Sequence, residues 1–144
     1  MKVADLIKGR TQTYSVSEGS TVLDAARYLR ERQVRATAVC NARGEPLGVI
    51  SQSDISEKVA AENRCPAWVK VEEVMGRNLI TVRPETTVAE CLRLLEKHGI
   101  YHLVVFGEGK QFYGMISARD ILKAMVTDEK ARADTLESWP PLPR

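Results

Sequence analysis

The chain has 144 residues, of which 44% are hydrophobic and 28% charged, a composition typical of one compact folded protein and not of a disordered or fibrous chain. No apolar run approaches the ~20 residues that a membrane-spanning helix needs, and the N-terminal MKVADLIKGR has no apolar signal-peptide stretch. The formal net charge is only +2, with Lys and Arg scattered, so we expect neither membrane nor nucleic-acid binding.

Cysteine usage points to a reducing compartment. Cys40, Cys65 and Cys91 are odd in number, show no CxxC spacing, and at least two of them fall in apolar segments, where a free cysteine behaves as a small hydrophobe. We therefore expect a cytoplasmic protein.

The chain contains an internal repeat: residues 16–55 match residues 82–121 at a constant offset of 66 without gaps. Identical residues occupy 11 of these 40 positions and gather at the starts of elements and at turns. The identical pairs are Val16/Val82, Thr21/Thr87, Val22/Val88, Arg27/Arg93, Leu29/Leu95, Val39/Val105, Gly48/Gly114, Ile50/Ile116, Ser51/Ser117, Asp54/Asp120 and Ile55/Ile121.

Both copies predict the same order of elements, βαββα. For the first copy the elements are a strand at 14–17, a helix opened by Ser20-Thr21, strands at 36–40 and 46–51, and a helix from Ser53. For the second copy they are a strand at 79–82, a helix opened by Thr86-Thr87, strands at 103–106 and 112–117, and a helix from Arg119.

The first helix of each copy carries start signals in its sequence. Thr21 with Asp24 and Thr87 with Glu90 have the capping-box spacing, in which a hydroxyl and an acid satisfy free amide groups at a helix start. In the second copy, His98-Gly99 predicts the helix end, because glycine accepts a left-handed cap.

These elements predict an α+β protein made of tandem βαββα repeats. We expect a first repeat at 1–60, a connector containing Pro66 at 61–70, a second repeat at 71–126 and a tail at 127–144. One copy alone would expose a large apolar face, so we expect the two to pack sheet against sheet with pseudo-two-fold symmetry. Any cleft formed by one copy is then formed again by the other, which predicts two related sites.

Two motifs in each copy resemble the CBS domain family. Gly-Val-Ile-Ser-Gln-Ser-Asp at 48–54 and Gly-Met-Ile-Ser-Ala-Arg-Asp at 114–120 look like the family's G-h-h-[ST]-x-x-D ending. The segments 34–39 and 100–105 are similar to its h-R-H-h-P-V-V strand entry, with Ala38 and Val104 in place of the proline. The Arg-His pair is split, because Arg35 stands in one copy and His102 in the other. The resemblance covers residues 3 to 125 and suggests a stand-alone domain pair.

The resemblance implies an adenosine ligand, with ribose hydroxyls donating to the motif aspartate and phosphates near the motif serine. A carboxylate accepts strong hydrogen bonds, and the amides at the following helix start suit a phosphate. One implied site contains Asp120, Ser117, Arg119 and Met115 with Tyr14, Val34 and Arg35. The other contains Asp54, Ser51, Ser53 and Val49 with Ile80, Ile100, Tyr101 and His102.

The two implied sites differ in charge. Arg119 and Arg35 would give the Asp120 site two cations, which suit a di- or triphosphate, whereas the Asp54 site suits a monophosphate or a neutral adenosine compound. We expect AMP, ADP or ATP as the ligand, with S-adenosylmethionine and dinucleotides also open, and no cofactor. Ligand binding would shift the packing of the two copies, and an effector protein or the mate in a flat homodimer would read that shift.

Simpler interpretations stay open. Ser51 with Asp54 and Ser117 with Asp120 also have capping-box spacing, which needs no ligand. The missing prolines and the split Arg-His pair favour a ligand-free scaffold that dimerises or docks on an enzyme or transporter.

The remaining motifs give little sign of other functions. No constellation predicts catalysis, and His98, His102 and Cys91 lack the spacing of a metal site. In the tail, a charged helix-like stretch at 128–137 precedes Pro140–Pro143, which suits polyproline geometry and a peptide motif for another protein.

Overall fold

The computed structural model describes residues 1–127 and residue 133. The predicted tail helix and polyproline segment lie outside these described residues, apart from the single residue 133. Within the described part, no helix is long and apolar enough to cross a membrane.

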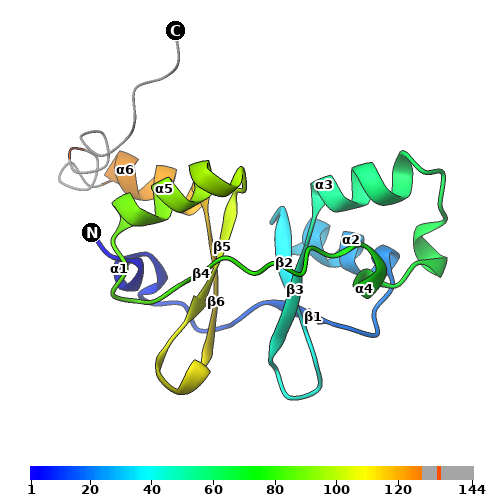
Figure 1. Cartoon of the computed structure of the whole chain (residues 1–144), viewed down its shortest axis with the longest axis horizontal. Coiled ribbons are helices and arrows are strands. Elements are labelled where there is room, and N and C mark those ends of the chain that lie inside the picture. Colours follow the sequence, from blue (N-terminus) through cyan, green and yellow to red (C-terminus); the bar gives the residue numbers. More distant parts are fainter. Residues whose placement is uncertain (128–132, 134–144) are drawn as a thin grey trace, which may run out of the picture. The chain divides into compact units, whose positions relative to one another are not determined.

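The chain forms an α+β fold with two compact units (Figure 1). We call residues 13–79 the Asp54 unit, and residues 1–12 together with the chain from Ile80 onward the Asp120 unit. Each unit contains one three-stranded sheet in which the first strand is parallel and the third antiparallel to the middle strand.

In the Asp54 unit, the strands are β1 (Ser15–Ser17), β2 (Ala36–Cys40) and β3 (Pro46–Ser51). Its helical segments are α2 (Val22–Arg32), α3 (Gln52–Ile55), the π-helical η1 (Ser56–Ala60), the 3-10 turn η2 (Pro66–Trp68) and α4 (Val71–Val74). The predicted order of elements is confirmed, and β2 and β3 have the predicted limits.

In the Asp120 unit, the strands are β4 (Thr81–Val82), β5 (His102–Phe106) and β6 (Phe112–Ser117). Its helical segments are α1 (Val3–Ile7), α5 (Val88–His98), the 3-10 turn η3 (Glu108–Lys110) and α6 (Ala118–Thr127). Thus βαββα occurs in both copies, and the first strand of each is shorter than the sequence predicted.

The caps explain where the long helices begin. At α2, Thr21 Oγ1 accepts from Asp24 N at 3.1 Å, while Thr21 N donates to the Asp24 carboxylate at 3.0 Å, which lowers the pKa of that carboxyl. At α5, Thr87 Oγ1 accepts from Glu90 N at 3.2 Å, and among the described hydrogen bonds the reciprocal one is missing. The capping box is therefore complete in the first copy and half-formed in the second.

Both helices end with a left-handed residue. Gly99 follows α5 with φ of 61°, as predicted, and Gln33 follows α2 with φ of 55°. The turn is the same in both copies, although a glutamine adopts this conformation less readily than a glycine.

The short helices α1 and α4 pack in units that differ from what their place beside the sequence repeats suggests. Val3 of α1 is fully buried in the core of the Asp120 unit, and its amide donates to Thr86 O at 2.9 Å. Figure 1 shows α1, in blue, within this unit, where it contacts α6 and β6. In the same way Val71 of α4 is buried in the Asp54 unit, where its amide donates to Ser20 O at 2.9 Å. The short helix that precedes each repeat therefore completes the core of the other one.

Equivalent positions form the two cores. Ile50 on β3 and Ile116 on β6 are 0% and 1% exposed. Each faces a middle-strand residue in the antiparallel register, Thr37 in one unit and Leu103 in the other. Thr37 is 2% exposed, so the Asp54 unit places a hydroxyl where the Asp120 unit has an aliphatic side chain.

Candidate functional site

In each copy, the motif serine and aspartate lie where the third strand ends and the following helix begins. Ser51 caps α3: its amide donates to Asp54 Oδ2 at 2.9 Å, and its hydroxyl accepts from Asp54 N at 3.2 Å. The Ser117 amide donates to Asp120 Oδ2 at 2.8 Å, and the Ser117 hydroxyl accepts from Asp120 N at 3.1 Å. Both pairs therefore form the predicted capping boxes, which fix the two carboxylates on rigid backbone.

The strand-entry segment of each copy lies beside its own motif. Arg35 O accepts a hydrogen bond from Gln52 N at 2.9 Å, at the start of α3. Tyr101 O accepts one from Ala118 N at 2.9 Å, at the start of α6. His102 is paired with Ser117 across the two strands.

His102 is electrostatically coupled to Asp120. Burial lowers the pKa of His102, and the nearby Asp120 carboxylate opposes that shift. The sequence grouped His102 with Asp54 and Arg35 with Asp120, whereas within the units His102 lies near Asp120 and Arg35 adjoins the start of α3. Contacts of these residues with the opposite motif stay a prediction.

The other predicted residues surround these motifs in their own units. Val49 on β3 and Met115 on β6 precede the motif serines by two positions and are half-buried. Ser53 and Arg119 are exposed in the first turns of α3 and α6, and Val34 and Ile100 are half-buried before the middle strands.

Three more predicted residues lie just before strands: Tyr14 before β1, Ile80 before β4 and Tyr101 before β5. Ile80 O accepts a hydrogen bond from Val104 N at 3.0 Å. Tyr14 is 43% exposed, and the Arg32 guanidinium lies 4.9 Å from the centre of its ring. Tyr101 is 72% exposed. These aromatic side chains offer surface for a ligand without being part of a core.

Sequence reasoning missed Arg10, which follows α1. Its Nη2 lies 3.1 Å from Asp120 Oδ2, and its Nη1 donates to Met115 O. Since 110 positions separate Arg10 from Asp120, no local pattern in the sequence could indicate this pair.

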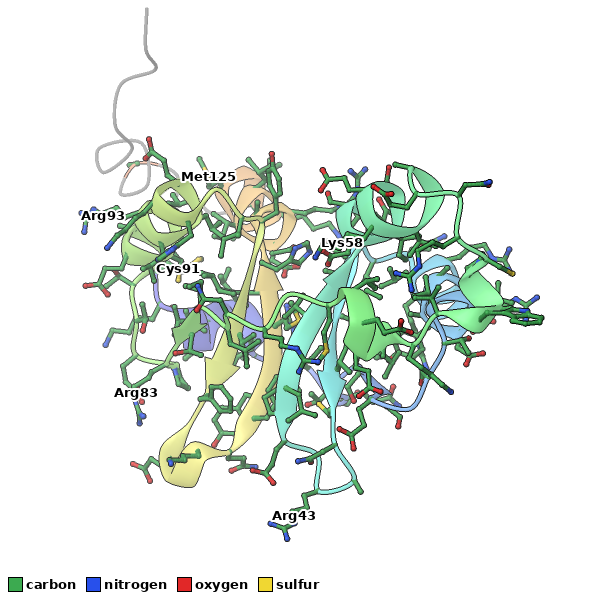
Figure 2. The ribbon with its side chains drawn as sticks, turned by 45° about the vertical axis from the view of Figure 1, so that its right-hand side comes forward. Arg43, Lys58, Arg83, Cys91, Arg93 and Met125 are labelled. Carbon is green, nitrogen blue, oxygen red and sulfur yellow. The ribbon has the colours of Figure 1, made fainter. Side chains whose placement is uncertain are left out.

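Lys58 was also missed, although the sequence contained a signal for it. Lys58 Nζ lies 3.0 Å from Asp54 Oδ1, four residues earlier, and donates to Val74 O at 2.8 Å. Figure 2 labels Lys58 on the helical segment after β3. A cation four residues after an acid is a known helical pair, and at the repeat offset of 66 the second copy has Ala124 at this position.

The two buried thiols, Cys40 and Cys91, are unsuited to nucleophilic chemistry. Burial, with a smaller contribution from the Glu90 carboxylate, raises the pKa of Cys91 to about 11, and burial also raises the pKa of Cys40. Both side chains therefore stay protonated near neutral pH. Among residues 1–127 and 133, no group of three or more His, Cys, Asp or Glu residues could hold a metal ion.

The family model described as CBS domain matches residues 3–61 and 71–127, which together make up most of the chain. The chain belongs to the CBS domain family. The two matches correspond to the two βαββα copies, so the chain carries a pair of CBS domains.

Relatives of known structure share this architecture. A protein of Burkholderia ambifaria, described as a signal-transduction protein with CBS domains, is 27% identical with a TM-score of 0.83, covering 90% of this chain and 96% of that one. A CBS domain protein of Pyrobaculum aerophilum, solved with AMP, is 19% identical with a TM-score of 0.81, covering 95% of this chain and 99% of that one. A CBS domain pair solved with 5'-methylthioadenosine and S-adenosylmethionine is 21% identical with a TM-score of 0.78, covering 88% of this chain and 97% of that one. At these two lower identities, the likeness shows the fold alone.

Curated relatives are longer than the matched region. A protein of Methanopyrus kandleri is 26% identical over 114 residues, which make up 79% of this chain and 58% of the relative. The chain thus spans little more than half of that relative.

Proposed function

We propose that this CBS domain pair is a regulatory module that binds an adenosine compound and catalyses no reaction. The proposal rests on the hydrogen bonds of the Asp120 carboxylate. Its Oδ2 is held by the Ser117 amide, while its Oδ1 has no hydrogen-bond partner among the described residues. A carboxylate fixed in this way can accept a ribose hydroxyl without rearranging its cap.

The surroundings of Asp120 suit a phosphorylated adenosine. Arg10 already lies against the carboxylate, and the exposed Arg119 is one position before it. Both guanidinium groups can donate to phosphate oxygens, and the Ser117 hydroxyl, which accepts from Asp120 N, can still donate its own proton. We propose AMP, ADP or ATP as ligands, and S-adenosylmethionine as the alternative that dispenses with the phosphate contacts. The AMP and S-adenosylmethionine complexes of proteins with this fold support an adenosyl ligand.

The remaining predicted residues complete the proposed sites. We propose Tyr14, Val34 and Arg35 as further ligand-binding residues for the Asp120 site. Asp54 with Ser51, Ser53 and Val49 would form the second site, to which Ile80, Ile100, Tyr101 and His102 would contribute. His102 also adjoins Asp120 in its own unit, so it is available to the first ligand as well.

Binding would act by population shift. The ligand stabilises the arrangement of the two copies that it binds better, and a homodimer mate or an effector protein reads the difference. All three cysteines are free, as a reducing compartment requires, and we propose that the module works in the cytoplasm.

The competing proposal is a scaffold that binds no nucleotide. It is supported by Ala38 and Val104 in place of the family's prolines, and by the cation paired with each motif aspartate. In that case the two aspartates act only as helix caps.

Calorimetric titration with AMP, ADP, ATP and S-adenosylmethionine separates the two proposals. If the module binds a ligand, we expect a saturable heat of binding. The affinity should be roughly 10- to 150-fold lower in Asp120→Ala, the range expected for a lost hydrogen bond to a charged group. The scaffold predicts no heat with any of the four ligands, while circular dichroism shows a folded protein.

A further inference from the structure

The two motif aspartates differ in the acceptor capacity that is left for a ligand. Asp54 Oδ2 accepts from both the amide and the hydroxyl of Ser51, each at 2.9 Å, and Asp54 Oδ1 is paired with Lys58 at 3.0 Å. Asp120 makes its bonds to Ser117 and Arg10 through Oδ2 alone. Both oxygens of Asp54 are therefore engaged, and within the described residues one oxygen of Asp120 is not.

Lys58 is held in place by a second acceptor. Its ammonium also donates to Val74 O at 2.8 Å, and Val74 is the last residue of α4, where carbonyls have no partner within the helix. Lys58 thus joins the motif carboxylate to a second element of the same unit. The Asp54 side chain is 17% exposed, against 34% for Asp120, so its ion pair is less screened by water.

A carboxylate offers about four acceptor positions, and a ribose bound through two vicinal hydroxyls uses two of them. At Asp54, Ser51 and Lys58 occupy three positions, so binding both hydroxyls requires breaking the contact between Lys58 and Oδ1, and the ligand exchanges a charge-assisted hydrogen bond for a neutral donor. At Asp120, Ser117 and Arg10 both bind Oδ2, so Oδ1 can accept both hydroxyls.

We infer that Lys58 closes the Asp54 carboxylate to adenosine compounds, so that the module binds one ligand per chain, at Asp120. The inference rests on the proposed function and specifies which of its two sites is filled. Lys58 accounts for the difference in ligand access between the two repeated motifs, because the second copy has Ala124 at the equivalent position.

The test replaces Lys58 with the residue that the second copy has at the equivalent position. Lys58→Ala copies Ala124, and Lys58→Met removes the charge but keeps an unbranched stem, which guards against loss of packing. Lys97→Ala, on the exposed last turn of α5, is the matched control for removing one positive charge. Calorimetric titrations use AMP and the uncharged 5'-methylthioadenosine, so that a general loss of attraction for anions is separated from opening of the site.

We expect the wild type and Lys97→Ala to bind one ligand per chain, and both Lys58 variants to bind two. Adding Asp54→Ala to either Lys58 variant should weaken the second site roughly 10- to 150-fold, and adding Asp120→Ala should weaken the first by the same factor. Two ligands per wild-type chain, or one ligand per chain in folded Lys58→Ala and Lys58→Met, would overturn the inference while leaving adenosine binding at Asp120 intact. Absence of binding in the wild type and every variant would overturn the proposed function and this inference together.

Discussion

The Asp54 and Asp120 units build the same backbone cap and then pair it with cations of different origin. In the Asp54 unit the cation is Lys58, one turn further along the same helical segment. In the Asp120 unit it is Arg10, which comes from the opposite end of the chain and packs there with α1. Repetition of the sequence therefore preserved the cap, while the residues that decide access to the carboxylate diverged.

Arg10 and Arg77, which follow α1 and α4, have different partners. A Gly-Arg pair follows the short helix that precedes each repeat, at Gly9-Arg10 after α1 and Gly76-Arg77 after α4, but there is one more residue between the helix start and the arginine at α1. Arg77 donates to Glu72 O at 2.8 Å and caps its own helix, whereas Arg10 contacts Asp120. One inserted residue accompanies a change of partner from a helix end to the candidate ligand site.

The largest effects are expected from the two equivalent core isoleucines. Ile50→Ala and Ile116→Ala should each lower the free energy of unfolding by ~2–5 kcal/mol, because both side chains are fully enclosed and leave a cavity. Urea denaturation followed by circular dichroism measures the loss. A cost below ~1 kcal/mol at either position would mean that this core relaxes around the cavity, and that the two units are not packed alike.

The acidic residue of the helix cap should contribute more to stability in the first copy than in the second. Thr21→Ala and Thr87→Ala should each cost ~1 kcal/mol, since both hydroxyls accept one amide of the first turn. Asp24→Ala should destabilise the protein more than Glu90→Ala, because only the Asp24 carboxylate has a described bond to the cap amide. The lowered pKa of Asp24 means that its contribution is present above the ordinary value of 3.8 and is lost as pH falls through the lower, folded-state value.

Equal losses for Asp24→Ala and Glu90→Ala in urea denaturation would contradict the half-formed cap in the second copy. The comparison is made near neutral pH, well above the lowered pKa of Asp24.

The buried hydroxyl of Thr37 offers a smaller test. Its one described bond is a long one, 3.4 Å to Ala38 O, so little compensates for burying it. Thr37→Val should leave the free energy of unfolding unchanged or raise it by up to ~1 kcal/mol. A loss of more than ~1 kcal/mol would show that the hydroxyl stabilises the Asp54 unit more than its described contact indicates.

His102 should give the Asp120 unit a pH dependence that its counterpart Ala36 cannot supply. Because burial holds the pKa of His102 below 6.5, the unfolded chain takes up a proton first as pH falls, so stability decreases from pH 6.5 down to the folded-state pKa and is then level. Melting curves between about pH 7.5 and about pH 5.5 should show a slope in the wild type that is reduced in His102→Gln. An identical slope in both proteins would contradict this assignment.

Much of the fold could be predicted because its determinants are local. The hairpin strands, the Thr21 cap and the Gly99 cap depend on residues a few positions apart, and the repeat shows the hairpins and the threonine caps twice. The packing of α1 on the Asp120 unit could not be predicted, since Val3 has the same apolar character whichever core it enters.

The candidate site divides in the same way. Ser117 and Asp120 could be found by their spacing, and Lys58 could have been found by comparing it with Ala124 in the aligned copies. The pair of Arg10 with Asp120 depends on tertiary packing alone.

The most direct test of adenosine binding at Asp120 is a titration of the ¹⁵N-labelled protein with AMP, followed by amide NMR shifts. We expect large, saturable shifts for the amides from Ser117 to Asp120, and these should require roughly 10- to 150-fold more AMP in Asp120→Ala. The absence of saturable shifts at Ser117 to Asp120, or shifts centred on Ser51 to Asp54 that persist in Asp120→Ala, would contradict it.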